Sequence, residues 1–146
     1  MALIFNKIFQ KQRLQKRLMD LLNEMEKNLE VFYVMDQRQF ITHGFILNAW
    51  ENIKEEELLK KYPSIHQYAK ALADFNNLFN EYKEFEQWYT ADMSRKTADN
   101  AKKLHGLKHD LDKQLKMMEA IIIPAGQDLE KEMLQLGFLK AWVKNS

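Results

Sequence analysis

Two histidines four residues apart, followed by an aspartate, are the pattern in this chain that comes nearest to metal chemistry. His105 and His109 fall on one face of a predicted helix, and Asp112 follows three residues later. Histidines at this spacing can share a metal ion when the helix presents them to a cavity. The leucines of the same helix, however, define a core stripe roughly 90° to 150° away around the axis. The sequence therefore predicts a solvent-facing surface without a metal, and a metal site at these three residues is the weaker alternative.

A second pair of chemically capable residues, Arg38 and His43, lies between two predicted apolar stripes. His43 shares a predicted helix face with Trp50, so its ring is expected to be buried. The stretch from residue 38 to residue 43 resembles the Arg and His motif of HEPN ribonucleases, which are small α-helical bundles, although Gln39 departs from the Asn, Asp or His usual in that family. The resemblance implies RNA cleavage by Arg38 and His43. The main interpretation remains a core histidine beside a surface arginine.

Glu86 falls in the middle of an apolar stripe, between Tyr82 and Tyr89. A carboxylate at such a position must be paired, or must lie where the bundle opens to water. We interpret it as a polar residue that sets helix register through a hydrogen bond to tyrosine or histidine. The alternative is a general acid or base, or an anchor for a ligand. His43 and Glu86 are thus the predicted buried polar residues, and a cavity lined by both would favour a binding site.

The composition excludes several classes of function. The chain has no cysteine, so thiolate nucleophiles, disulfides and cysteine-bound zinc are ruled out, and the cytoplasm is the predicted compartment. Four glycines and two prolines leave little material for phosphate-binding loops. No catalytic triad or di-iron pattern is present, so we expect a non-catalytic protein without a cofactor. The net charge of +1 gives no reason to expect a nucleic acid as partner.

Apolar residues return every three or four positions along nearly the whole chain, which is typical of α-helices. A chain of 146 residues is long enough to bury a core, and we expect one domain over 1–146. The predicted fold is an all-α, up-and-down four-helix bundle with one additional shorter helix packed across it. The helices are expected, in chain order, over 7–35, 37–59 (the shorter one), 64–93, 98–122 and 128–144.

Short polar and proline-containing stretches mark the predicted helix ends. Asp36 and Ser64 each precede a glutamine by three residues, which predicts a capping box at the start of two helices. Pro63 is expected to break one helix, and Pro124 with Gly126 to break another. The short connections predict that sequential helices are antiparallel neighbours.

The first 17 residues are the clearest indication of a partner. They combine bulky apolar residues with basic ones, and no acidic residue occurs before Asp20. Such a segment can lie on an anionic membrane surface or dock into a groove of another protein. It can also simply begin the first helix and cover the end of the core. The residues expected to carry docking are Phe5, Ile8, Phe9, Lys11 and Arg13.

The last predicted helix is apolar over more of its circumference than one bundle contact requires. Leu134, Phe138 and Trp142 lie on a different face from Leu129 and Met133. We therefore expect a homodimer whose interface is formed by Leu134, Phe138 and Trp142, because twofold self-contact is the commonest way to cover such a patch. The alternative is that Phe138 and Trp142 are buried in the core of the monomer.

Together these observations predict a non-catalytic helical-bundle interaction or scaffold module that associates with itself, with a membrane-peripheral position as a further option. The alternative is a small bundle with a buried polar site, which either binds a ligand or cleaves RNA through Arg38 and His43.

Overall fold

The computed structural model describes residues 2–138, with side chains from residue 6 onward. No strand occurs in this part of the chain, which confirms the predicted fold class of an all-α bundle with four main helices and a shorter one. The elements are α1 (Ala2–Arg38), α2 (Asn48–Ile53), the 3₁₀ helix η1 (Glu57–Lys61), α3 (Pro63–Ala91), the 3₁₀ helix η2 (Met93–Arg95), α4 (Ala98–Lys116) and α5 (Met118–Gln135).

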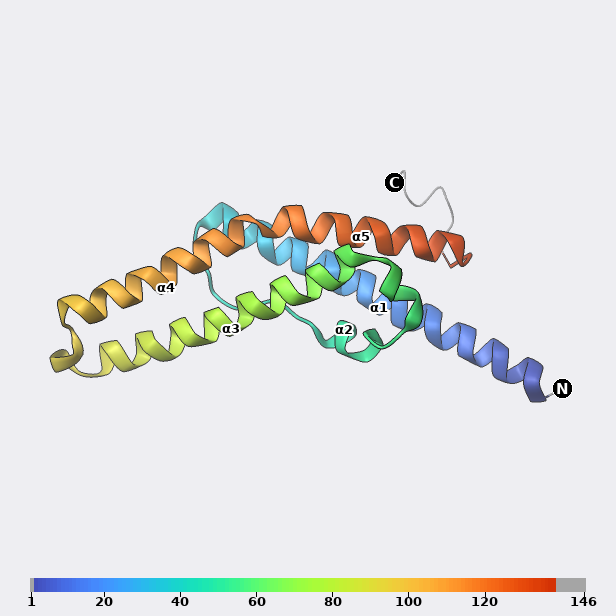
Figure 1. Cartoon of the computed structure of the whole chain (residues 1–146), viewed down its shortest axis with the longest axis horizontal. Helices are drawn as coiled ribbons and strands as arrows, with labels where there is room; N and C mark the ends of the chain where they lie inside the picture. The colour runs from blue at the N-terminus through green and yellow to red at the C-terminus, as the bar shows by residue number, and fades with distance from the viewer. Residues whose placement is uncertain (1, 139–146) are drawn as a thin grey trace.

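The four main helices form three rods (Figure 1). α1 and α3 run in the same direction, and α4 and α5 follow one another along a third rod that runs back past both. α5 packs against α1 and α3, whereas α4 packs mainly against α3. The molecule is therefore elongated, with the start of α1 projecting at one end and the α3–α4 hairpin at the other.

The core lies where the three rods meet. The apolar stripe of α3 is buried only as far as Phe75, and Met93 at the far end of that predicted stripe is 78% exposed. Beyond Phe75, α3 has α4 as its main neighbour, so one face of each helix is left open to solvent. The fully buried apolar side chains include Leu18, Leu21, Ile53, Leu59, Ile65, Tyr68, Leu72, Phe75, Ala125, Leu129 and Met133.

The break between the last two helices lies at Met117 and not at the predicted Pro124 and Gly126. The Met117 N–H donates to the Gln114 carbonyl at 3.1 Å, which tightens the end of α4, and α5 begins at the next residue. Pro124 lies inside α5 and removes one helical hydrogen bond. Burial of Ala125 beside it helps to keep this part of α5 helical. α5 therefore continues the direction of α4 instead of turning back (Figure 1).

Most of the predicted second helix, 37–59, is not α-helical. α1 ends at Arg38, and Gln39 has a φ of +53°, so the capping box expected at Asp36 does not form. Residues 40–47, which we call the strap, have no regular structure, and the chain becomes helical again in the short α2. The strap passes between α1 and α3 (Figure 1).

Two asparagine side chains hold the strap to the helices on either side. On α3, the Asn76 amide accepts the Phe45 N–H at 2.7 Å and donates to the Phe45 carbonyl at 2.9 Å. On α1, the Asn28 amide accepts the Ile46 N–H at 2.9 Å and donates to the Ile46 carbonyl at 2.7 Å. It also donates to the Tyr68 hydroxyl at 2.8 Å. Each amide thus pairs with the strap as a neighbouring peptide would, and the strap ties α1 to α3.

Gly44 explains why the strap can lie so close to α3. A Cβ atom at this position would be 2.3 Å from Oδ1 of Asn76, which no ordinary contact allows. The next side chain, Phe45, is buried and lies 5.1 Å from the Phe75 ring, measured between centroids. Gly44 is therefore placed for close backbone approach, whereas the sequence pattern put it inside a helix.

A cluster of polar side chains, which we call the latch, joins the start of α3 to α5. The Tyr62 hydroxyl donates to Glu132 at 2.6 Å, and the Lys61 ammonium lies 2.7 Å from the same carboxylate oxygen. Ser64 donates to Asp128 at 2.5 Å instead of capping α3, which begins at Pro63, so the second predicted capping box does not form. Glu132 is buried, and its charge is balanced within the latch.

The latch makes the stability of the fold depend on pH. Burial disfavours the charge on Glu132, but its bonds to Lys61 and Tyr62 outweigh this and hold the pKa of the carboxyl below 4.5. The unfolded chain therefore takes up the proton first as the pH falls. The stabilisation is present above 4.5 and is lost as the pH falls through the lower folded pKa.

We expect Glu132→Gln to flatten the acid limb of the stability profile, because the substituted side chain no longer titrates. The measurement is urea unfolding followed by circular dichroism between about pH 3 and pH 7. Glu119→Gln, at an exposed position of α5, is the control and should leave the limb unchanged. An acid limb equally steep in wild type and Glu132→Gln would show that the latch does not carry the effect.

Candidate functional site

The candidate metal ligands of α4 are not joined by a further ligand in the described part of the chain. His105 and His109 are exposed, and Asp112 is half-buried. Among the described residues, no group of three His, Cys, Asp or Glu side chains is placed to hold a metal ion. His105 and His109 therefore lie on the exposed surface of α4, as the position of the leucine stripe predicts, whereas Asp112 lines a pocket together with Tyr82 and Glu86 of α3.

Arg38 and His43 lie on different elements. Arg38 is the last residue of α1 and His43 belongs to the strap, and both are exposed. His43 Nδ1 is 3.1 Å from the carbonyl of the adjacent Gly44. The prediction that His43 is buried is wrong because the strap is not helical, so the face shared with Trp50 does not exist. No hydrogen bond within residues 6–138 joins Arg38 to His43.

Glu86 is half-buried and paired with a tyrosine, as its structural interpretation predicts. The Tyr82 hydroxyl donates to Glu86 at 2.7 Å, and Lys83 lies 3.6 Å away. Burial, together with this hydrogen bond, raises the pKa of Tyr82 to about 12. The pocket beside Glu86 has a volume of about 70 Å³, and His43 does not line it. The cavity shared by His43 and Glu86, which would have favoured a binding site, is therefore not formed.

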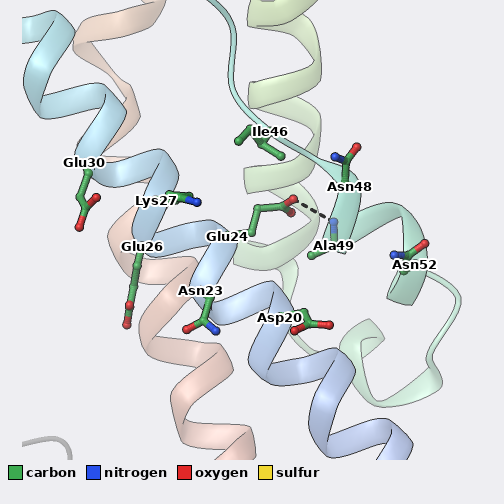
Figure 2. A pocket seen from close by; sticks show the side chains of 10 residues that line it. All are labelled: Asp20, Asn23, Glu24, Glu26, Lys27, Glu30, Ile46, Asn48, Ala49 and Asn52. Atoms are coloured by element: carbon green, nitrogen blue, oxygen red, sulfur yellow. Dashed lines mark hydrogen bonds between the residues drawn. The ribbon is translucent and has the colours of Figure 1, made fainter.

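An open acidic groove of about 530 Å³ lies between α1 and α2 (Figure 2). Its most recessed carboxylate, Glu24, points at the start of α2 and accepts the N–H groups of Ala49 at 2.8 Å and Trp50 at 3.2 Å. Burial raises the pKa of Glu24, and these two bonds act against the rise. Glu26 and Glu30 point away from α2 in this view. The acidic side chains do not converge, and the recessed one serves as a helix cap.

The surface that stands apart from the bundle is the start of α1. We define the arm as residues 2–13 of α1, which projects past the end of α5 (Figure 1). Every described side chain from Asn6 to Arg13 is exposed, and the first buried one is Leu18. Ile8 and Phe9 are 46% and 63% exposed. Phe5 lies in the first turns of the arm, and its side chain is outside the described part of the structure.

Five basic residues follow one another along the arm and its base, and no acidic residue precedes Asp20. Arg17 bonds to Glu56 at 2.8 Å and to the Asn52 carbonyl. Lys16 lies 3.5 Å from Asp20. Of these five residues, Lys7, Lys11 and Arg13 have no ion pair with another described residue.

A groove of about 720 Å³ runs between the arm and the end of α5. We call it the arm groove. α5 ends at Gln135, and Gly137, with a φ of +77°, turns the chain so that the Phe138 N–H donates to the Met133 carbonyl at 2.8 Å. The Phe138 ring then lies 6.0 Å from the Lys11 ammonium. The lining residues are Lys7, Gln10, Lys11, Arg13, Leu14, Arg17, Glu56, Gln135, Leu136 and Phe138.

Sequence reasoning did not find the arm groove. One signal was present, because Lys7 with Lys11 and Arg13 with Arg17 are two basic pairs at four-residue spacing. Two of the groove's three apolar lining residues, Leu136 and Phe138, however, follow the end of α5, which only the fold brings to the arm.

One residue of the predicted dimer interface, Phe138, packs against the core of its own chain. Phe138 is half-buried and packs against the core, and Leu134 is half-buried. Trp142 lies outside the described residues. Phe138 therefore contacts the core without being fully buried, and both the homodimer and the alternative of burial in the monomer core stay predictions.

Comparison of the chain with protein-family models, with curated proteins and with solved structures finds no match. No helix in the described part is both long and apolar enough to cross a membrane. The arm and the arm groove are the features of the described structure that best indicate a function.

Proposed function

We propose that this protein is a non-catalytic interaction module that docks on an anionic membrane surface through the arm. The observation that carries the proposal is the projection of a basic helix, with exposed Ile8 and Phe9, beyond the end of the bundle. A helix of this kind lies in the plane of the membrane interface, with its apolar side toward the acyl chains.

The positions of the side chains around the arm suit that orientation. Ile8 and Phe9 are about 100° apart around the helix axis, and the direction midway between them defines the apolar side of the arm. No charged residue before Lys16 points in this direction. Arg13 and Lys11 flank this direction at roughly 90° to 110° on either side. Long basic side chains at those angles can reach lipid phosphates while the apolar ones enter the interface.

The expected energies are those of a reversible, peripheral contact. Full burial of an Ile or Phe side chain contributes about 1.5–3 kcal/mol, so two that are half exposed offer roughly 2–3 kcal/mol together. Each basic residue near an anionic surface adds about 1 kcal/mol, which gives about 2 kcal/mol for Lys11 and Arg13. The apolar and electrostatic contributions are therefore comparable, and neither suffices alone for stable binding.

The same charges argue against pairing of two arms in a dimer. A symmetric contact would bring together Lys7, Lys11 and Arg13 of two arms, none of which has an ion pair among the described residues. Like charges placed opposite each other at an interface are unfavourable. Self-association, if it occurs, must use another surface.

We expect the full-length protein to co-sediment with vesicles containing about 30% phosphatidylserine, and Ile8→Ser/Phe9→Ser to reduce binding at least about tenfold. Tyr33→Ser/Val34→Ser is the matched control, because these adjacent residues of α1 are 44% and 49% exposed but lie outside the arm. The control should bind like wild type. Raising the salt concentration should weaken wild-type binding.

Two results would contradict the proposal. One is a wild-type protein that stays in the supernatant with anionic vesicles at low salt. The other is an equal loss of binding in the control variant, which would mean that exposed apolar side chains anywhere on α1 give the same adhesion.

A further inference from the structure

Within residues 2–138, no third helix packs along the arm. Through the middle of the molecule α5 packs against both α1 and α3. α3 begins at Pro63, close to the point where Ser64 meets Asp128 of α5, and the latch holds Lys61 and Tyr62 to Glu132 one turn further on. Past the latch, the end of α5 and the arm form the two sides of the arm groove, and the space between them is open.

We infer that the arm groove is a docking site for an amphipathic helix with acidic flanks from a partner protein. Such a helix would pack there as the third helix. The inference extends the proposed interaction role to the face of the arm opposite Ile8 and Phe9. It uses the apolar residues Leu14, Leu136 and Phe138, and it shares the cations Lys11 and Arg13 with the membrane contact.

The lining of the groove has the chemistry that such a helix requires. Leu14, Leu136 and Phe138 supply the apolar surface, which suits one face of an amphipathic helix. On the helical wheel Leu14 and Gln10 lie between two basic rims. The rims are Lys7 with Lys11 on one side and Arg13 with Arg17 on the other.

The positive charges that line the groove favour a partner helix with negative charges. Glu56 is the single carboxylate of the lining, and Arg17 already pairs with it at 2.8 Å. The remaining cations, Lys7, Lys11 and Arg13, have no ion pair among the described residues. A partner helix with acidic residues beside its apolar stripe would supply the missing counter-charges, and a basic one would be repelled.

The size of the groove also fits a short helix. The lining residues of α1 run from Lys7 to Arg17, which corresponds to about 15 Å along the axis. This is the length of about three turns of a partner helix. The volume of about 720 Å³ can accept the side chains of one helical face.

The test uses two synthetic, fluorescein-labelled 14-residue peptides and the full-length protein, without vesicles. Both peptides carry leucine at helical three- and four-residue spacing; one has glutamate at the flanking positions and the other lysine. In fluorescence anisotropy we expect the glutamate peptide to bind at least tenfold more tightly than the lysine peptide. Lys7→Glu/Lys11→Glu should reverse this preference.

The controls separate this inference from the membrane proposal. Lys96→Glu/Lys102→Glu makes the same charge change at exposed positions of the α3–α4 hairpin and should keep the wild-type preference. Ile8→Ser/Phe9→Ser should also keep it, although vesicle binding falls. If Ile8→Ser/Phe9→Ser loses vesicle binding but still prefers the glutamate peptide, the substitutions affect the membrane-facing side of the arm and leave the arm groove intact.

Three outcomes would overturn the inference. The first is equal binding of the two peptides, or binding of neither, to the wild-type protein. The second is loss of peptide binding in Ile8→Ser/Phe9→Ser with no effect of Lys7→Glu/Lys11→Glu. The third is a wild-type dimer in sedimentation that Lys7→Glu/Lys11→Glu converts to a monomer, because the occupant of the groove would then be a second copy of this chain.

Discussion

Asn28→Ala is expected to lower the free energy of unfolding by about 3–5 kcal/mol. The side chain is fully buried and makes three hydrogen bonds, two to Ile46 and one to Tyr68. Truncation leaves the buried Tyr68 hydroxyl and the part-buried peptide groups of Ile46 without these partners, and an orphaned buried group costs about 1–3 kcal/mol. Since domains are stable by only about 5–15 kcal/mol, the fold should become marginal.

The measurement is urea unfolding monitored by circular dichroism, with a thermal melt as a second readout. The melting temperature should fall by about 10–15 °C for a chain of this size. Asn23→Ala removes the same side chain from an exposed position of α1 and should cost less than about 0.5 kcal/mol. Equal effects of the two substitutions would mean that the strap is not held by Asn28.

Gly44→Ala is expected to cost about 2–4 kcal/mol, although it adds a single methyl group. The new Cβ would meet Oδ1 of Asn76 at 2.3 Å. The Asn76 amide cannot withdraw without giving up both of its hydrogen bonds to Phe45. The strap would have to lift from α3, and the buried Phe45 ring would leave its contact with Phe75.

A double-mutant cycle separates this clash from a general intolerance of side chains in the strap. Asn76→Ala alone should be destabilising, because the Phe45 peptide loses its partners. In that background Gly44→Ala should cost much less than in wild type, since the atom that it strikes has gone. Additive effects in the cycle would place the penalty of Gly44→Ala elsewhere, in the backbone of the strap.

The main helices could be predicted from the sequence because their signals are local. Three- and four-residue spacing of apolar side chains depends only on the geometry of one helix, so the stripes through Leu18 and Leu72 identified α1 and α3. The predicted helix from residue 128 covers only the second half of α5, because Pro124 was expected to end the preceding helix. The basic, apolar character of the arm was equally visible, since it is a property of consecutive residues. Exposure of Ile8 and Phe9 in the structure agrees with that pattern.

The strap could not be predicted, because what holds it is far away in the chain. Asn28 lies 18 residues before Ile46, and Asn76 lies 31 residues after Phe45. The local sequence pattern predicted that these strap residues are helical, in which case their backbone N–H and carbonyl groups would have been paired within the helix. The tertiary structure instead satisfies them with side chains from α1 and α3, and a buried aromatic ring offsets the loss of helical structure.

The candidate site likewise has features that the local sequence predicts and features that depend on tertiary packing. The sequence alone determined that the chain is a helical bundle with a basic amphipathic beginning, because both follow from residues close together in the chain. Tertiary structure decided that His43 is exposed and that Phe138 lies against the first helix. It also placed the end of α5 beside Lys7 and Lys11 to form the arm groove. These positions are set by packing between segments that are distant in the sequence. The pattern of neighbouring residues does not specify which distant segment will pack against them.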